Sequence, residues 1–304
     1  MPNHKNIQKI LLAVDGSEHS HAATIFVRNL PFSASPEIHS VAVLPNFQDF
    51  QRPVLETALK QTRHLLEERN LNVDTRLLRG HPASEIIEYA NQLNPTLIVM
   101  GAKGLRSTLG ILLGGVAQQV VEHANWPVLI VRFPVDKVQR ILFVTDGSIY
   151  SQRAAEFLTE FPPPTDVLVH VLHVLPPPPV AEIFAKSGYY GVSTINNPPI
   201  VQDIEETFAY QMKEEEDQGK KILDDAIRMM RSSEFRINKV LLRGDAATEI
   251  MDYIKEKDID LIIAGSRGLG QVRGWLLGSV SRKLVHYTDC SVLIVKSPQK
   301  NGAL

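Results

Sequence analysis

The sequence predicts an α/β protein made of two tandem, doubly wound parallel-sheet domains. Three observations support this fold class: the two halves of the chain repeat one another, short apolar runs alternate with helical patterns, and several of those runs end in glycine-containing turns. Alternation of strands and helices is typical of a parallel sheet with right-handed crossovers. The 304 residues are enough for two domains of the common size of about 150 residues.

Internal self-similarity defines the domain organisation. Residues 9–23 match 140–154, 79–90 match 243–254, 97–115 match 261–279, and 127–134 match 291–298. The offset grows from 131 positions at Asp15 and Asp146 to 164 positions at Gly101 and Gly265, so the second copy carries 33 more residues between these points. We predict domains at 1–135 and 136–304, with an insertion at about 176–200 and a lengthened helix after it.

Each copy predicts the same order of elements. Apolar runs at 10–14 and 141–145 are expected strands, each followed by a helix. Next come a strand (39–44; 167–174), an amphipathic helix (54–69; 203–232) and a third strand (73–78; 237–242). Pro82 or Ala246 begins a short helix, and the fourth strand (96–100; 260–264) is apolar almost throughout. Such strands are typical of a parallel sheet covered on both faces.

Composition and charge argue against several classes of protein. The formal net charge of −2 gives no bulk attraction to nucleic acid or to a membrane surface, so neither is expected as a partner. No apolar run approaches the length that spans a bilayer, and the first residues lack the features of a secretion signal. The single cysteine, Cys290, excludes an internal disulfide and fits a reducing compartment. A cytoplasmic location is therefore expected.

The candidate site lies beyond the first and fourth strands, because open parallel sheets bind ligands at the carboxyl ends of their strands. In the second copy, Asp146 would meet a loop that contains Gly265, Gly268 and Gly278 and then Ser279. Glycine lets the backbone approach a ligand, and the free N–H groups at a helix start favour phosphate. The corresponding positions of the first copy are Asp15, Gly101, Gly104, Gly114 and Gly115.

Known phosphate motifs and a plain surface turn fit these residues less well. The chain lacks a P-loop, and it lacks G-x-G-x-x-G after the first strand. The glycines could serve a surface turn alone, with Ser279 as an ordinary N-cap, but two copies with the same spacing argue against this. His170 and His173 are three residues apart on a strand and point to opposite faces, so no metal site is expected.

The spacing Gly265-x2-Gly268-x9-Gly278-Ser279 resembles the G-2x-G-9x-G-[ST] nucleotide loop of the universal stress protein family. The resemblance covers nearly the whole chain, twice. It implies an adenine nucleotide α-hydrolase-like fold with strand order 3-2-1-4-5 and ATP as the ligand, to which Mg²⁺ could be bound. It also implies that the aspartate lies near the adenosine, while the loop, with Val280 after it, holds ribose and phosphates.

Residues at the strand ends and charged residues of the loops are further candidates. Thr145 and Val174 end the first two strands of the second copy and could line an adenine pocket, or could be ordinary strand residues. Arg267 suits phosphate recognition, as does Arg273, with Lys103 and Arg106 as the first copy's nearest equivalents. The alternative for Arg267 and for Arg273 is a solvated loop charge.

The first copy departs from the loop pattern at one residue. Gly115 stands where the pattern has serine or threonine, so the backbone N–H is kept and the hydroxyl is lost. We therefore expect the C-terminal site to bind ATP more tightly. Because dimers of the resembled family commonly pair fifth strands, 128–131 could pair with 292–295 as a built-in pseudo-dimer, and a further homodimer could form.

The leading functional hypothesis is an ATP-binding, stress-response regulatory protein whose nucleotide occupancy alters its association with an unknown protein partner. The alternatives are a weak ATP hydrolase or adenylyl-transfer enzyme, and a nucleotide-free scaffold. Strong catalysis is not expected, because the sequence shows no evident general base with an orienting partner. The insertion could act as a lid or as a partner-binding arm with Tyr189 and Tyr190, or as a plain loop.

Overall fold

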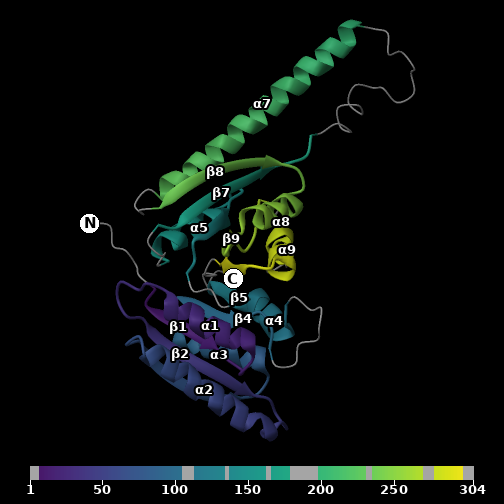
Figure 1. Ribbon diagram of the computed structural model, residues 1–304. Coiled ribbons are helices and arrows are strands. Elements are labelled where there is room, and N and C mark those ends of the chain that lie inside the picture. The colour runs from purple at the N-terminus through teal and green to yellow at the C-terminus, as the bar shows by residue number, and fades with distance from the viewer. Residues whose placement is uncertain are drawn as a thin grey trace, which may run out of the picture.

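The computed structural model describes residues 7–104, 113–133, 137–161, 166–178, 198–230, 235–269 and 277–296. Within these ranges the two tandem domains share one ten-stranded sheet, in the order β3-β2-β1-β4-β5-β10-β9-β6-β7-β8 (Figure 1). Each half of this sheet has the order 3-2-1-4-5, so the predicted fold class is confirmed.

The first domain contains β1 (Lys9–Ala13), α1 (Glu18–Asn29), β2 (Glu37–Leu44), the short 3₁₀ helix η1 (Asp49–Gln51), α2 (Arg52–Glu67), β3 (Asn72–Arg79), α3 (Pro82–Leu93), β4 (Leu97–Gly101), α4 (Gly115–His123) and β5 (Val128–Val131). The second contains β6 (Arg140–Val144), α5 (Ile149–Glu160), β7 (Leu168–Leu175), α7 (Pro198–Met229), β8 (Arg236–Arg243), α8 (Ala246–Lys257), β9 (Leu261–Gly265), α9 (Ser279–Tyr287) and β10 (Ser291–Val295). Apart from η1, these elements match the predicted order to within a few residues.

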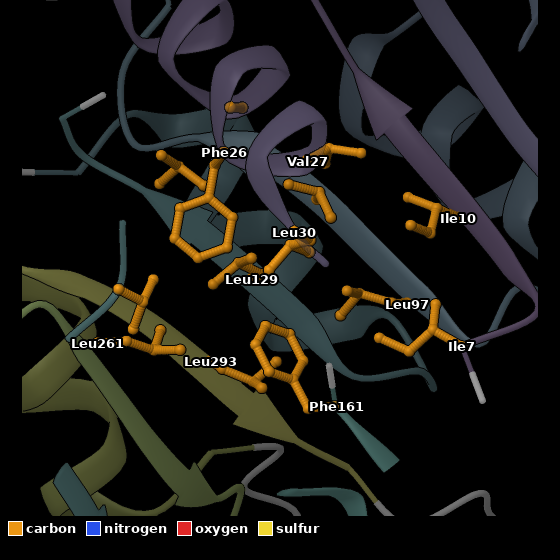
Figure 2. Packing of buried hydrophobic residues seen from close by; sticks show 14 of the residues in the cluster. Ile7, Ile10, Phe26, Val27, Leu30, Leu97, Leu129, Phe161, Leu261 and Leu293 are labelled. Atoms are coloured by element: carbon orange, nitrogen blue, oxygen red, sulfur yellow. The ribbon is translucent and has the colours of Figure 1, made fainter. Parts of the chain in front are cut away.

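Apolar residues cover both faces of the sheet because successive side chains of a strand point to opposite sides. In β1, Ile10 and Leu12 belong to one buried cluster, while Leu11 and Ala13 belong to another on the opposite face. The first cluster runs across the domain boundary. Figure 2 shows Phe26 of α1 beside Leu129 of β5, with Leu293 and Phe161 of the second domain nearby. The two domains therefore share the core on this face of the sheet.

The domains meet where β5 and β10 pair antiparallel, with Leu129 opposite Leu293. This is the predicted pairing of the two fifth strands, and here it lies within one chain. Each half-sheet is parallel apart from this junction. An antiparallel junction places the carboxyl ends of one domain's strands at the edge where the other domain's strands begin. The two candidate sites therefore lie at opposite edges of the shared sheet.

Helix α7 is the main difference between the domains. It has 32 residues, whereas its counterpart α2 has 16, so the predicted lengthening is confirmed. Its first half extends beyond the sheet (Figure 1). Arg243 at the end of β8 donates to the carbonyl of Pro176 (3.0 Å) and contacts Glu215 of α7 (2.5 Å). The middle of α7 is thereby linked to the carboxyl ends of β7 and β8.

Two predictions concern residues that the structure does not describe. Residues 179–197, with Tyr189 and Tyr190, lie outside the described residues, so a lid or a partner-binding arm stays a prediction. The boundary at 135–136 also falls on residues that the structure does not describe. Among the described helices, none combines the length and the apolar character needed to cross a membrane.

Candidate functional site

The turn after the first strand of each domain holds the aspartate in place. Gly147 has φ +77° and Gly16 has φ +85°, a left-handed backbone conformation that favours glycine. In the second domain, Asp146 Oδ1 accepts a hydrogen bond from the N–H of Ser148 (3.0 Å). Ser148 then caps α5 by accepting the N–H of Ser151. Thus the glycine shapes the turn, the serine starts the helix, and the aspartate remains available to the loop.

The glycine-rich loop contacts this aspartate directly. The N–H of Leu269 donates to Asp146 Oδ2 at 3.0 Å. A Cβ at Gly268 would lie 2.6 Å from the same oxygen, and a Cβ at Gly104 would lie 2.6 Å from Oδ2 of Asp15. Only glycine lets the two segments approach so closely in both domains. The structure therefore brings together the predicted aspartate and the predicted loop, twice.

The first glycine of each loop has a packing role. A Cβ at Gly265 would lie 2.7 Å from the carbonyl carbon of Tyr150, and one at Gly101 would lie 2.5 Å from that of His19. These glycines let the first turn of α5 or α1 pack against the end of the fourth strand. Their place in the loop is thus explained by contact between backbone segments, and ligand contact stays a prediction for them.

Helices α9 and α4 begin at the far end of the loops. Gly278 is the N-cap of α9, and Gly114 is the N-cap of α4; neither has a side-chain cap. The interpretation of Ser279 as an ordinary N-cap is therefore wrong, because Ser279 is the first helical residue and is exposed. The first N–H groups of a helix lack a partner within it, and Val280, half-buried against the core, completes this first turn.

The remaining candidates surround the turn and the loop. Arg267 is half-buried, with its guanidinium carbon 5.7 Å from the ring centre of Tyr150. Thr145 uses its side chain within the turn, donating to Ser151 Oγ (3.1 Å) and accepting from the N–H of Gly147 (3.2 Å). Val174 is half-buried against the core. A ligand role for these residues stays a prediction, and Arg106 and Arg273 lie outside the described residues.

Four residues beside the two sites were not among the predicted site residues. Tyr150 faces Arg267, and its counterpart in the first domain is His19, whose Nδ1 lies 2.6 Å from the carbonyl oxygen of Arg132. Arg132 and Lys296 directly follow β5 and β10 and are buried. The sequence did carry a signal for these cations, because a basic residue follows the run Val-Leu-Ile-Val in both copies.

The buried cations have displaced pKa values. Burial lowers the pKa of Lys296 to about 8, although its Nζ donates to the carbonyl of Glu122 at 2.9 Å. Burial also lowers the pKa of Arg132, whose guanidinium donates to the carbonyl of Val285. In both cases removal from water disfavours the charged form. The desolvation of each cation therefore offsets part of the stability that its hydrogen bond contributes.

Histidine and cysteine side chains have structural surroundings. His170 Nδ1 lies 2.7 Å from the hydroxyl of Tyr253, whereas His173 donates from Nδ1 to the carbonyl of Thr145 at 2.8 Å. Across the described part of the chain, no group of three or more candidate metal-binding side chains is found. Burial raises the pKa of the Cys290 thiol to about 12. A thiol that stays protonated is a poor nucleophile.

The aspartate and the helix start present different groups at the site. Both carboxylate oxygens of Asp146 accept backbone N–H groups, from Ser148 and from Leu269. An aspartate held in this way orders the loop, whereas a general base must reach a substrate proton. The uncapped start of α9 and the nearby Arg267 offer N–H groups and positive charge to an anion.

Fold and site together define a pair of doubly wound α/β domains, each with a glycine-rich loop at the carboxyl edge of its sheet. The model of the universal stress protein family matches residues 6–132 and 137–296. The chain therefore belongs to the universal stress protein family, of the type with two tandem domains.

Individual relatives agree with this assignment. A universal stress protein of Methanocaldococcus jannaschii is 32% identical over 141 residues, which are 42% of this chain and 83% of the relative. One from Mycobacterium tuberculosis is 22% identical over 94% of this chain and 96% of its own length. The crystal structure of a universal stress protein from Archaeoglobus fulgidus superposes with a TM-score of 0.63 at 20% identity, covering 97% of this chain and 99% of that one.

Proposed function

We propose that this chain is an ATP-binding regulatory protein of the stress-response type, with two nucleotide sites of unequal strength. The observation that carries the proposal is the contact of Asp146 with the N–H of Leu269. This bond joins the first turn to the loop that leads to the uncapped start of α9. Structural glycines alone would explain a turn, but they would not require a carboxylate that orders the loop or a helix that begins without a side-chain cap.

Each part of the C-terminal site has a distinct role in this proposal. The N–H groups of Ser279 and Val280 and the hydroxyl of Ser279 receive phosphate oxygens. Arg267 adds positive charge beside them, with Tyr150 supporting its guanidinium. The adenosine lies over the turn that contains Asp146. Mg²⁺, when bound to ATP, would neutralise part of the phosphate charge.

The N-terminal site has the same backbone arrangement and lacks one hydroxyl. Gly104 approaches Asp15 as Gly268 approaches Asp146, and α4 also begins at an uncapped glycine. Gly115 contributes an N–H but no side-chain donor. A hydrogen bond to a charged group contributes roughly 1.5–3 kcal/mol, so the N-terminal site is the weaker one.

Nucleotide occupancy then changes how the protein associates with a partner protein that is still to be identified. The single cysteine fits a reducing compartment, and we place the activity in the cytoplasm. Regulation by occupancy requires that bound ATP persists, which is consistent with an aspartate occupied by two backbone N–H groups.

Identification of a co-purifying nucleotide tests the proposal. The protein is purified without added nucleotide and denatured, and the released small molecules are identified by mass spectrometry. We expect ATP from the wild-type chain and less of it from a Gly268→Ala variant. Release of ADP or AMP alone would support the enzymatic alternative. Absence of any nucleotide, together with no binding of added ATP, would support a scaffold and contradict the proposal.

A further inference from the structure

Two buried cations cross the boundary between the domains in a reciprocal way. Arg132 and Lys296 have exposed fractions of 4% and 9%. The guanidinium of Arg132 donates to the carbonyl of Val285 in the last turn of α9, which belongs to the second domain. Nζ of Lys296 donates to the carbonyl of Glu122 in the last turn of α4, which belongs to the first domain (2.9 Å).

The two helices that receive these cations are those whose first residues form the candidate phosphate sites. Helix α9 begins at Ser279, and α4 begins at Gly115. Each has 9 residues, and at a rise of 1.5 Å per residue its two ends are about 13 Å apart. The carboxyl end of a helix carries partial negative charge, and a cation there is favourable. One end of each helix thus faces its own site, and the other end is held by the opposite domain.

Each cation is also attached to the site of its own domain. The N–H of Ser266, which starts the C-terminal loop, donates to the carbonyl of Val295 (3.0 Å), the residue before Lys296. In the same way, the N–H of Ala102 donates to the carbonyl of Val131 (2.8 Å), the residue before Arg132. The backbone that carries each cation is therefore part of the edge where its own loop begins.

We infer that Arg132 and Lys296 are positioning residues that act across the domain boundary. Arg132 holds the phosphate helix of the C-terminal site, and Lys296 holds the phosphate helix of the N-terminal site. The inference rests on the proposed nucleotide-binding function. Its physical basis is that a helix fixed at its carboxyl end presents its first N–H groups in one place, so that less order has to be created when phosphate binds.

Calorimetric titration with ATP tests this in a chain with one working site. The Asp15→Ala background leaves the C-terminal site, and Arg132→Met is added to it. We expect the Kd of this site to rise about three- to tenfold, within the range of a cation's effect at a helix terminus. Arg132→Lys should restore most of the affinity, because lysine makes the corresponding contact in the other domain.

The matched control is Lys283→Met in the same background. Lys283 lies on α9 and is half-exposed, so the substitution removes one positive charge from the same helix without touching its last carbonyls. An unchanged Kd for Lys283→Met supports a positional effect. A loss equal to that of Arg132→Met would reveal a general effect of charge and overturn the inference.

The reciprocal contact keeps the inference testable if Arg132→Met does not fold. Lys296→Met in an Asp146→Ala background should weaken the N-terminal site while the melting temperature at pH 7 is kept or raised. If Lys296 had a structural role alone, the substitution would lower both the melting temperature and the ATP affinity, and this result would overturn the inference. Unchanged ATP affinity in both arms would overturn the inference alone. If neither background binds ATP although both are folded, the proposed function is overturned, and this inference with it.

Discussion

The Gly115→Ser substitution should convert the weaker site into a copy of the stronger one. A Cβ at Gly115 meets no atom of the described residues within 4 Å, so they leave room for a serine side chain. The residue is the first of α4, as Ser279 is the first of α9, and its N–H is retained. The added hydroxyl can reach a phosphate oxygen, and such a bond contributes roughly 1.5–3 kcal/mol. This corresponds to about ten- to a hundredfold in affinity.

The assay is calorimetric titration of ATP into Asp146→Ala protein, in which the N-terminal site remains, with and without Gly115→Ser. The control substitution is Gly115→Ala, which adds a Cβ that meets none of the described residues within 4 Å and adds no hydroxyl. We expect Gly115→Ser to lower the Kd by at least tenfold and Gly115→Ala to leave it within about twofold. Equal affinities for the serine and alanine variants would refute the assignment of the helix start as the phosphate site.

Contacts in the site and at the domain boundary lead to three further predictions. Gly268→Ala would place a Cβ 2.6 Å from Asp146 Oδ2; we expect displacement of the carboxylate and at least a tenfold loss of ATP affinity at the C-terminal site by calorimetry. Burial lowers the pKa of Lys296 to about 8, so the unfolded chain binds more protons between about pH 8 and 10.5 and this group makes stability rise with pH there. Denaturant titrations should therefore show that any stability gained by Lys296→Met at pH 7 shrinks as the pH is raised to about 10; a pH-independent difference would contradict this. Because the pKa of Cys290 is raised to about 12, alkylation of the native protein at about pH 8 should be on the order of a thousandfold slower than that of the unfolded chain.

The order of strands and helices was predictable because it depends on local patterns of apolar residues. The fourth strands are apolar in almost every residue, which indicates burial on both faces, and β4 and β9 are buried as expected. The aspartate and the loop could be placed together because both follow strands that end at the same edge. Their contact through Leu269 then follows from glycine at position 268.

What could not be predicted depends on geometry between segments. The N-cap lies at Gly278, which has an extended backbone (φ −67°, ψ 160°), one residue before Ser279, the N-cap of the alternative interpretation. The role of Gly265 depends on how closely α5 packs against the end of β9. The paths of Arg132 and Lys296 depend on the antiparallel junction of β5 with β10, which turns the end of each strand toward the other domain.

The two halves of the chain are alike in fold and unequal in detail. The C-terminal domain has Ser279 as the first residue of α9 and has the longer α7, while the N-terminal domain has Gly115 as the first residue of α4. Because the two candidate sites lie at opposite edges of one sheet, the proposed function allows a filled site at one edge and an empty site at the other. Such asymmetry would suit a regulator that responds to nucleotide concentration over a wide range.

The most direct test of the central claim is the affinity of each site for ATP, measured by calorimetry in the matched variants Asp15→Ala and Asp146→Ala. Each substitution removes the aspartate of one site and leaves the other site intact. We predict saturable binding at one site in both proteins, with a Kd about ten- to a hundredfold lower in Asp15→Ala, because Ser279 is present in the remaining site. Equal affinities would contradict the inequality of the sites, and no binding to either folded variant would contradict the nucleotide-binding function itself.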